Sequence, residues 1–238
     1  MHEGDNNTHY FHSKATHRFR RNKIEALENS KGESCVDENG IANIFVDFYQ
    51  NLFAFSSLDQ FEEALEATPM VVTEEMNQEL AAPFEKAEVD IALKQMDPLK
   101  ALGLDGMPPL FFQHFWLTIG DEVEEAVLTC LETGSIPPSI NRTFITLIPK
   151  VKNPVRVSDY RPIALCNILY KLISKVLANR LKKILPYVIS ESQSAFQSSK
   201  AITNNVLVAF GTLHHMKNQK SKKGGFMAMK LDMSKAYD

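Results

Sequence analysis

Residues 167–185 carry the strongest helical pattern in the chain, and they limit most what the rest of it can form. Ile168, Leu172 and Val176 follow one another at a spacing of about one helical turn. The charged side chains in the same stretch are Lys171, Lys175, Arg180, Lys182 and Lys183. Apolar groups at this period lie on one face of an α-helix, and such a face must be covered by other elements. The sequence therefore predicts a long helix with an apolar, core-facing side and a charged side.

Shorter signals predict the remaining elements. Helical patterns cover residues 41–53, 85–96, 110–116, 121–133 and 206–216, with a capped start at Thr73 and a C-terminal cap at Gly134. Residues 144–148, bounded by a proline, have the composition of a strand, and a basic hairpin continues from them. A second, buried strand is expected at 226–231, with Asp232 at its end. Helices followed by a few strands predict an α+β fold.

The net charge of −3 conceals a division of the chain into three parts. Residues 1–34 hold 6 Lys/Arg and 5 Asp/Glu, residues 35–141 hold 3 and 20, and residues 142–238 hold 17 and 4. The middle part, at −17, repels a polyanion, whereas the last part, at +13, attracts one. Nucleic acid is therefore a candidate partner for one part of the chain. The alternative is that the opposite charges hold the two parts together.

The segment HYFHSKATHRFRRNKI, residues 9–24, interleaves basic and aromatic side chains and holds no acid. Cations suit a phosphate backbone, and aromatic rings suit stacked bases. Arg18, Arg20 and Arg21 are therefore candidate contacts to nucleic acid. A solvated basic helix fits this stretch equally well.

Two further groups suit phosphoryl chemistry. Asp232 offers an oxygen ligand of the kind that Mg²⁺ prefers, although an aspartate at a strand end more often makes turn hydrogen bonds. One carboxylate alone does not make a two-metal site. In the basic hairpin, Lys150, Lys152 and Arg156 could clamp a triphosphate, because guanidinium groups match phosphate oxygens. Cations on a surface hairpin also serve solubility alone.

Several longer motifs follow one another along the chain. They are FITLIPKVKNPVRVSDYRPIALCNILYKLISKVLANRLKKILP (144–186), ISESQSAF (189–196), ITNNVLVAF (202–210) and MAMKLDMSKAYD (227–238). Upstream stand EGDNNTHYFHSKATHRFRRNKI (3–24) and GLDGMPPLFFQHFW (103–116). In this order they resemble the reverse transcriptases of plant LINE-type, non-LTR retrotransposons. The resemblance runs through nearly the whole chain.

The resemblance implies part of a right-hand polymerase. Residues 1–34 are similar to the linker that follows the endonuclease, residues 35–141 to an acidic helical region before the fingers, and residues 142–238 to the fingers and the first palm strand. The family copies RNA into DNA with Mg²⁺ and deoxynucleoside triphosphates. Its partners are the RNA template and the RNA–DNA duplex, and its expected location is the nucleus.

The resemblance also implies roles for single residues. Asp232 matches the first catalytic aspartate, which binds the metal, and the backbone carbonyl of Met233 matches a further metal ligand. Arg161, in DYRPI, matches the arginine of the fingers that grips the triphosphate, and Lys150 is a candidate second contact. Tyr237 matches the aromatic residue beneath the incoming sugar. The remaining candidate contacts to nucleic acid are Lys182, Lys183 and Lys200.

The family's second metal-binding block, two adjacent aspartates, has no match in residues 1–238. We therefore expect a fragment without polymerase activity, cut from a longer polyprotein. Ser199-Lys200, where the family usually has Gly-Arg, fits a decayed copy. The alternatives are a non-catalytic nucleic-acid-binding fragment and a remnant without function. Three cysteines far apart, and no apolar run long enough to span a membrane, favour an intracellular setting.

Overall fold

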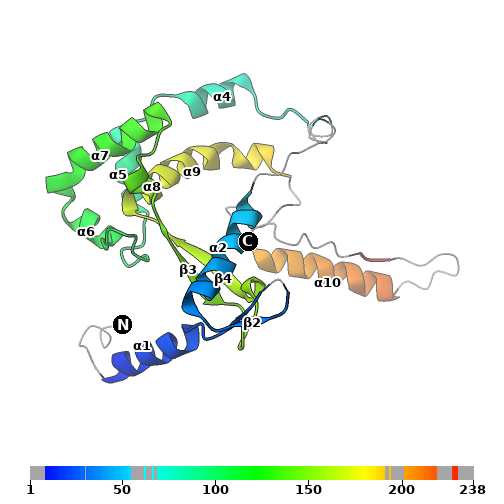
Figure 1. Cartoon of the computed structure of the whole chain (residues 1–238). Coiled ribbons are helices and arrows are strands. Elements are labelled where there is room, and N and C mark those ends of the chain that lie inside the picture. Colours follow the sequence, from blue (N-terminus) through cyan, green and yellow to red (C-terminus); the bar gives the residue numbers. More distant parts are fainter. Residues whose placement is uncertain are drawn as a thin grey trace.

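A computed structural model describes residues 9–29, 31–54, 62, 66, 69–190, 193, 201–218 and 227–229. Its helices are α1 (His9–Asn22), α2 (Glu38–Phe53), α4 (Glu74–Ala81), α5 (Lys86–Lys94), α6 (Pro109–His114), α7 (Trp116–Thr133), α8 (Pro138–Asn141), α9 (Ile168–Val188) and α10 (Ile202–Asn218). Its strands are β1 (Leu27–Glu28), β2 (Ser34–Cys35), β3 (Phe144–Pro149) and β4 (Tyr160–Leu165), with a 3₁₀ turn at Val157–Asp159. This mixture of helices and strands confirms the α+β prediction. Figure 1 shows a helical body around α9, and the β3–β4 hairpin that runs from it to α2.

The long helix α9 is the centre of the helical body. Ile168, Leu172 and Val176 are fully buried against α5 and α7, in a core to which α6 also contributes Phe112, as their spacing predicts. The neighbouring helix α7 ends at Gly134, whose φ of 65° lies in the left-handed region that favours glycine. The helix expected at 110–116 is α6, which ends at His114. Helix α7 begins at Trp116, directly after Phe115, and so starts five residues earlier than the helix expected at 121–133.

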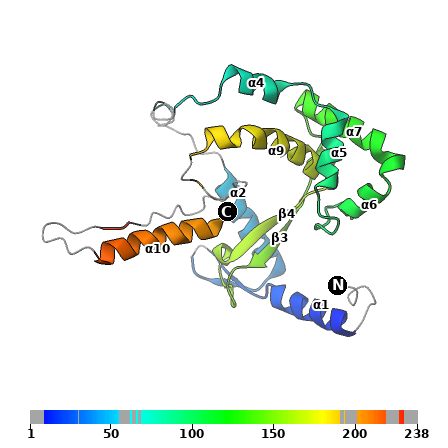
Figure 2. The ribbon, with the colours of Figure 1, turned by 180° about the vertical axis from the view of Figure 1, so that it is seen from behind.

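The β3–β4 hairpin carries the second core at its far end. Its strands are antiparallel, and Leu147 stands opposite Pro162 while Ile148 stands opposite Arg161. Around its tip pack five buried residues: Leu27, Ile41, Phe45, Val157 and Tyr160. This core draws on all three parts that the charge pattern distinguishes. The hairpin and α2 lie side by side from both directions of view (Figures 1 and 2).

The loop before α6 is held against the start of α9. A side chain at Gly103 would meet Asn167 atoms at about 2.5 Å, so only glycine allows this approach. The buried side chain of Asn167 accepts a hydrogen bond from Asp105 N (3.3 Å) and donates one to Ser139 O (3.2 Å). Lys171 Nζ donates to Ala101 O (2.6 Å). These contacts hold the loop before α6 in a fixed position against the start of α9.

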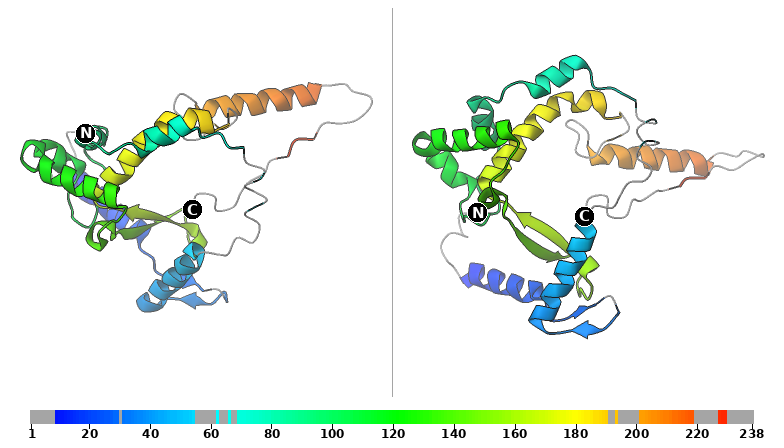
Figure 3. Two further views of the ribbon diagram at one scale, coloured as in Figure 1. Left: turned by 90° about the horizontal axis from the view of Figure 1, so that it is seen from above. Right: turned by 45° about the horizontal axis from the view of Figure 1, so that its top comes forward.

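The C-terminal elements project away from both bodies (Figure 3). Helix α10 confirms the helix expected at 206–216, but its described side chains are almost all exposed, Phe210 at 70%. The prediction of a buried strand is wrong at Met227–Met229, which has no regular secondary structure and exposes Met227 at 82%. Among the described residues, no strand lies beside this stretch to complete its hydrogen bonds. The rest of the expected palm strand lies outside the described residues.

Candidate functional site

Arg161 lies on the exposed face of the β3–β4 hairpin. Successive side chains of a strand point to opposite faces. Because the ring of Tyr160 is buried, the side chain of Arg161 points to the exposed face. By the register, Arg161 shares this outer face with Ile148, which is 43% exposed. Phe144 and Ile163, also substantially exposed, lie on the same face. The hairpin thus presents a cation next to a row of apolar side chains.

Lys150 lies at the tip end of the same hairpin. The antiparallel ladder continues one step beyond β3, because Lys150 N donates to Asp159 O at 2.7 Å. Lys150 lines a small cavity of about 50 Å³ together with Tyr49 and Tyr160. Arg161 does not line this cavity. The structure therefore places the two candidate phosphate contacts on one hairpin but does not bring Arg161 into the cavity beside Lys150.

The tip of the hairpin, residues 150–159, is tied to the N-terminal segment. Glu28 N donates to Val155 O (2.7 Å), and the carboxylate of Glu28 accepts from Arg156 Nε (3.1 Å). Asp159 accepts from the backbone N–H groups of Arg156 and Val155, both at 3.0 Å. These two hydrogen bonds lower the pKa of Asp159. Arg156 is therefore held by an acidic partner, whereas none of the described residues forms an ion pair with Arg161.

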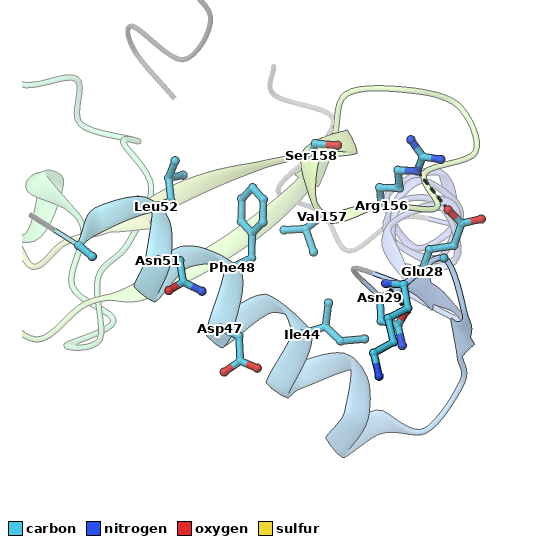
Figure 4. A pocket seen from close by; sticks show the side chains of 13 residues that line it. Glu28, Asn29, Ile44, Asp47, Phe48, Asn51, Leu52, Arg156, Val157 and Ser158 are labelled. Carbon is cyan, nitrogen blue, oxygen red and sulfur yellow. Dashed lines mark hydrogen bonds and ion pairs between the residues drawn. The ribbon is translucent and has the colours of Figure 1, made fainter. Parts of the chain in front are cut away.

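A groove of about 1230 Å³ lies beside this tip, between β1, α2 and the 3₁₀ turn. Figure 4 shows Ile44, Phe48 and Leu52 projecting from α2, with Val157 and Arg156 across from them. The dashed line between Arg156 and Glu28 marks the ion pair at its end. The groove combines an apolar floor with a balanced set of charges.

The candidate contacts to nucleic acid fall on two separate elements. Arg18 and Arg20 are exposed on α1, and Arg21 belongs to the same helix. Helix α1, which carries them, contacts β3 of the hairpin. Lys182 and Lys183 are exposed near the end of α9, where Lys183 pairs with Glu79 of α4 at 3.2 Å. Helices α1 and α9 lie on opposite sides of the hairpin (Figures 1 and 2).

The remaining candidate residues lie outside the described residues: Asp232, Met233, Tyr237 and Lys200. Within the part of the chain that the structure describes, no group of three or more His, Cys, Asp or Glu could hold a metal ion. The described residues therefore offer no metal site in place of the one expected at Asp232. In the same part, no helix is long and apolar enough to cross a membrane.

Sequence reasoning missed the role of Arg180, which it counted among the charged side chains of α9. Arg180 is 6% exposed and binds both carboxylate oxygens of Glu88, at 2.8 and 2.7 Å. Its guanidinium also donates to the carbonyls of Leu80, near the end of α4, and of Ala82 and Pro83, in the loop before α5. It stacks over the ring of Phe84 at 3.7 Å. A detectable signal existed, since Arg180 stands four residues after Val176, on the buried stripe.

Comparison with known proteins decides the family. The family of reverse transcriptases, RNA-dependent DNA polymerases, matches residues 148–238, which include β4, α9 and α10. The transposon TX1 uncharacterized 149 kDa protein of Xenopus laevis is 30% identical over 237 residues, 98% of this chain. The Pol polyprotein from the type-2 retrotransposable element R2DM of Drosophila melanogaster is 26% identical over 151 residues, 63% of this chain. The chain belongs to the non-LTR retrotransposon reverse transcriptases.

This reverse transcriptase chain spans a small part of its relatives. It covers 18% of the TX1 protein, 14% of the R2DM polyprotein and 11% of a putative 115 kDa protein in the type-1 element R1DM, to which it is 25% identical over 111 residues. The relatives come from a frog and a fly, so the plant origin that the motifs suggested is not supported by them. The family match begins at Ile148 and includes Arg161 and Asp232.

Proposed function

We propose that this chain supplies the fingers, and the first metal-binding aspartate, of an RNA-directed DNA polymerase. The segments 1–34, 35–141 and 142–238 then correspond to the linker, the helical region before the fingers, and the fingers with the start of the palm. The observation that carries this proposal is the position of Arg161. It stands in the matched segment, on the exposed face of β4 and directly after the buried Tyr160. A guanidinium held in this way can bind phosphate oxygens through two parallel hydrogen bonds.

In the proposed site, each of five residues has a separate binding role. Arg161 binds the triphosphate, Lys150 borders it at the hairpin tip, and Tyr237 lies beneath the incoming sugar. Asp232 and the carbonyl of Met233 would hold Mg²⁺, which neutralises charge on the phosphates when it is bound. The bound partners are then an RNA template, an RNA–DNA duplex and deoxynucleoside triphosphates, and the nucleus is the proposed location.

Triphosphate binding tests the role of Arg161. We expect the backbone amide signal of Arg161 to shift when deoxyguanosine triphosphate is added to the ¹⁵N-labelled chain. Arg161→Gln should weaken binding about tenfold, because a charge-assisted, bidentate contact is lost. The control is Arg142→Gln, which removes an exposed cation at the opposite end of the hairpin. Equal weakening by both variants would show a general charge effect and refute the assignment.

We further propose that residues 1–238 alone do not synthesise DNA. Asp232 and the Met233 carbonyl supply at most two oxygens, whereas Mg²⁺ takes about six ligands in near-octahedral order. Positioning of the primer carries most of the catalysis in phosphoryl transfer, and a single carboxylate positions little. Purified protein and an Asp232→Asn control should both fail to extend a primer on an RNA template. Template-dependent product that disappears in the control would mean that another carboxylate, such as Asp159 or Asp238, completes the site.

A second function, non-catalytic binding of nucleic acid, is favoured by one observation. Exposed cations lie on two elements, α1 and α9, on both sides of the hairpin that carries Arg161. This binding requires no metal and can exist without synthesis.

A further inference from the structure

The tip of the β3–β4 hairpin is enclosed by a segment far away in the sequence. Leu27 of β1, with Ile41 and Phe45 of α2, packs against Val157 and Tyr160 at the tip. All five side chains are less than 9% exposed. A hairpin of two strands is marginally stable by itself in water, so this enclosure supplies the packing that holds it.

The central contact of this enclosure joins Phe45 to Tyr160. The two rings meet edge to face, with centroids 5.4 Å apart and planes at 83°. Tyr160 is 3% exposed, and burial raises the pKa of its hydroxyl. Phe45 also stacks with Tyr49, with ring centroids 6.4 Å apart. The ring of Tyr160 is therefore packed in one defined position, and the Phe45 ring forms one side of that packing site.

A second set of contacts fixes the orientation of the hairpin tip around the packed Tyr160 ring. Glu28 holds the loop through its backbone N–H to Val155 and through its carboxylate to Arg156. Asp159 closes the loop from within by accepting from the same two residues. The direction of β4 is thus fixed at its first residue, Tyr160.

Arg161 is the next residue, and its direction follows from that of Tyr160. Side chains alternate along a strand, so a Tyr160 ring held on the α2 face sets the Arg161 side chain on the opposite face. We propose that Phe45 is a positioning residue for Arg161. Through Phe45, helix α2 holds the Arg161 guanidinium in the orientation that binds a triphosphate, although α2 lies outside the matched reverse transcriptase segment. This inference rests on the triphosphate-binding role proposed for Arg161. Presetting a binding group lowers the ordering cost of binding.

The experiment compares substitutions at Phe45 with a substitution in the other core. Phe45→Ala removes the ring that packs against Tyr160, and Phe45→Leu keeps most of the apolar volume of the phenylalanine side chain. The control is Val127→Ala on α7, a fully buried residue that packs in the helical body and not at the tip. For each variant, the backbone amide shift of Arg161 is recorded without ligand and during titration with deoxyguanosine triphosphate. Thermal unfolding measures the loss of stability of each variant.

We expect Phe45→Ala to move the ligand-free Arg161 signal and to weaken triphosphate binding at least about fivefold, because the binding group must then be ordered on binding. Phe45→Leu should restore most of the affinity, and Val127→Ala should leave both readouts unchanged despite its lower unfolding temperature. An unchanged Arg161 signal and affinity in Phe45→Ala would overturn the inference. So would an equal effect of Val127→Ala. If Phe45→Ala does not fold, Phe45→Leu decides: it should shift the ligand-free Arg161 signal slightly but more than Val127→Ala does, and an equal or smaller shift would overturn the inference.

The two proposals fail in different ways. If the unaltered chain shows no response to the triphosphate, the role of Arg161 fails, and the presetting for a triphosphate fails with it. If the unaltered chain responds and Arg161→Gln weakens binding, but Phe45→Ala does not, only the positioning role of Phe45 fails.

Discussion

Replacing Arg180 with alanine is expected to lower the free energy of unfolding by about 3–5 kcal/mol, the usual cost of breaking a buried ion pair from one side. The guanidinium is almost completely buried between α9 and the loop that joins α4 to α5. Its removal leaves the carboxylate of Glu88 without its partner and three carbonyl oxygens without a donor. Each unsatisfied buried group adds to the cost. The loop also loses the cation over the ring of Phe84.

The same pair predicts how stability responds to acid. The hydrogen bond from Arg180 lowers the pKa of Glu88 below that of an unfolded glutamate, against a smaller effect of burial. A lowered pKa means that the stabilisation is fully present above the unfolded value of about 4.3 and is lost as pH falls through the folded value. The unaltered chain should therefore lose stability on acidification in this range. Arg180→Ala should lose less, because its Glu88 no longer has the partner that lowers the pKa.

Urea unfolding of the full chain measures both effects. The matched control is Lys183→Ala, one helical turn later, which breaks the exposed pair with Glu79 and should cost about 1 kcal/mol or less. A double variant, Arg180→Met with Glu88→Leu, should recover much of the lost stability, because it removes both charges and keeps apolar volume. If Arg180→Ala costs no more than Lys183→Ala, the buried network does not hold the loop.

Helix α9 and its buried face could be predicted from the sequence, but the burial of Arg180 on that face could not. The pattern around Leu172 and Val176 predicted α9 and its buried face, because apolar periodicity is a local property of the chain. The arginine on the same stripe was counted as a surface charge. Its burial depends on Glu88 and on carbonyls nearly a hundred residues earlier in the chain, and no local pattern encodes that distance.

The candidate site follows the same division. The strand at residues 144–148 and the hairpin that continues from it were predicted from composition, and β3 and β4 confirm them. The enclosure of the hairpin tip by Leu27 and Phe45 could not be predicted, because it joins segments that the charge pattern assigns to different parts. Among the described residues, two ion pairs join the acidic middle part to the basic last part: Arg180 with Glu88, and Lys183 with Glu79. Arg156 with Glu28 joins the first part to the last. Some of the opposite charges therefore contact each other between these parts, and whether the remaining cations bind nucleic acid stays a prediction.

The chain is expected to bind single-stranded RNA with a steep dependence on salt, despite its net charge of −3. Arg18 and Arg20 on α1, with Lys182 and Lys183 on α9, are exposed cations on two elements. If these four contact phosphates, the slope of log K against log salt is about −2.8, so affinity falls on the order of 50-fold between 50 and 200 mM salt. Filter retention at several salt concentrations measures this slope. Affinity unchanged over the range would contradict phosphate binding.

Paired substitutions then separate the two elements. Arg18→Gln with Arg20→Gln, and Lys182→Gln with Lys183→Gln, should each reduce the slope by about 1.4, since each lost phosphate contact removes about 0.7. The control, Lys86→Gln with Lys94→Gln, makes the same change in net charge on α5, where both lysines already pair with acids. A reduced slope in the α1 variant alone would mean that Glu79 retains Lys183 and that α4 shields this end of α9 from RNA. An equal reduction in all three variants would mean that only net charge matters, and would exclude a defined interface on α1 and α9.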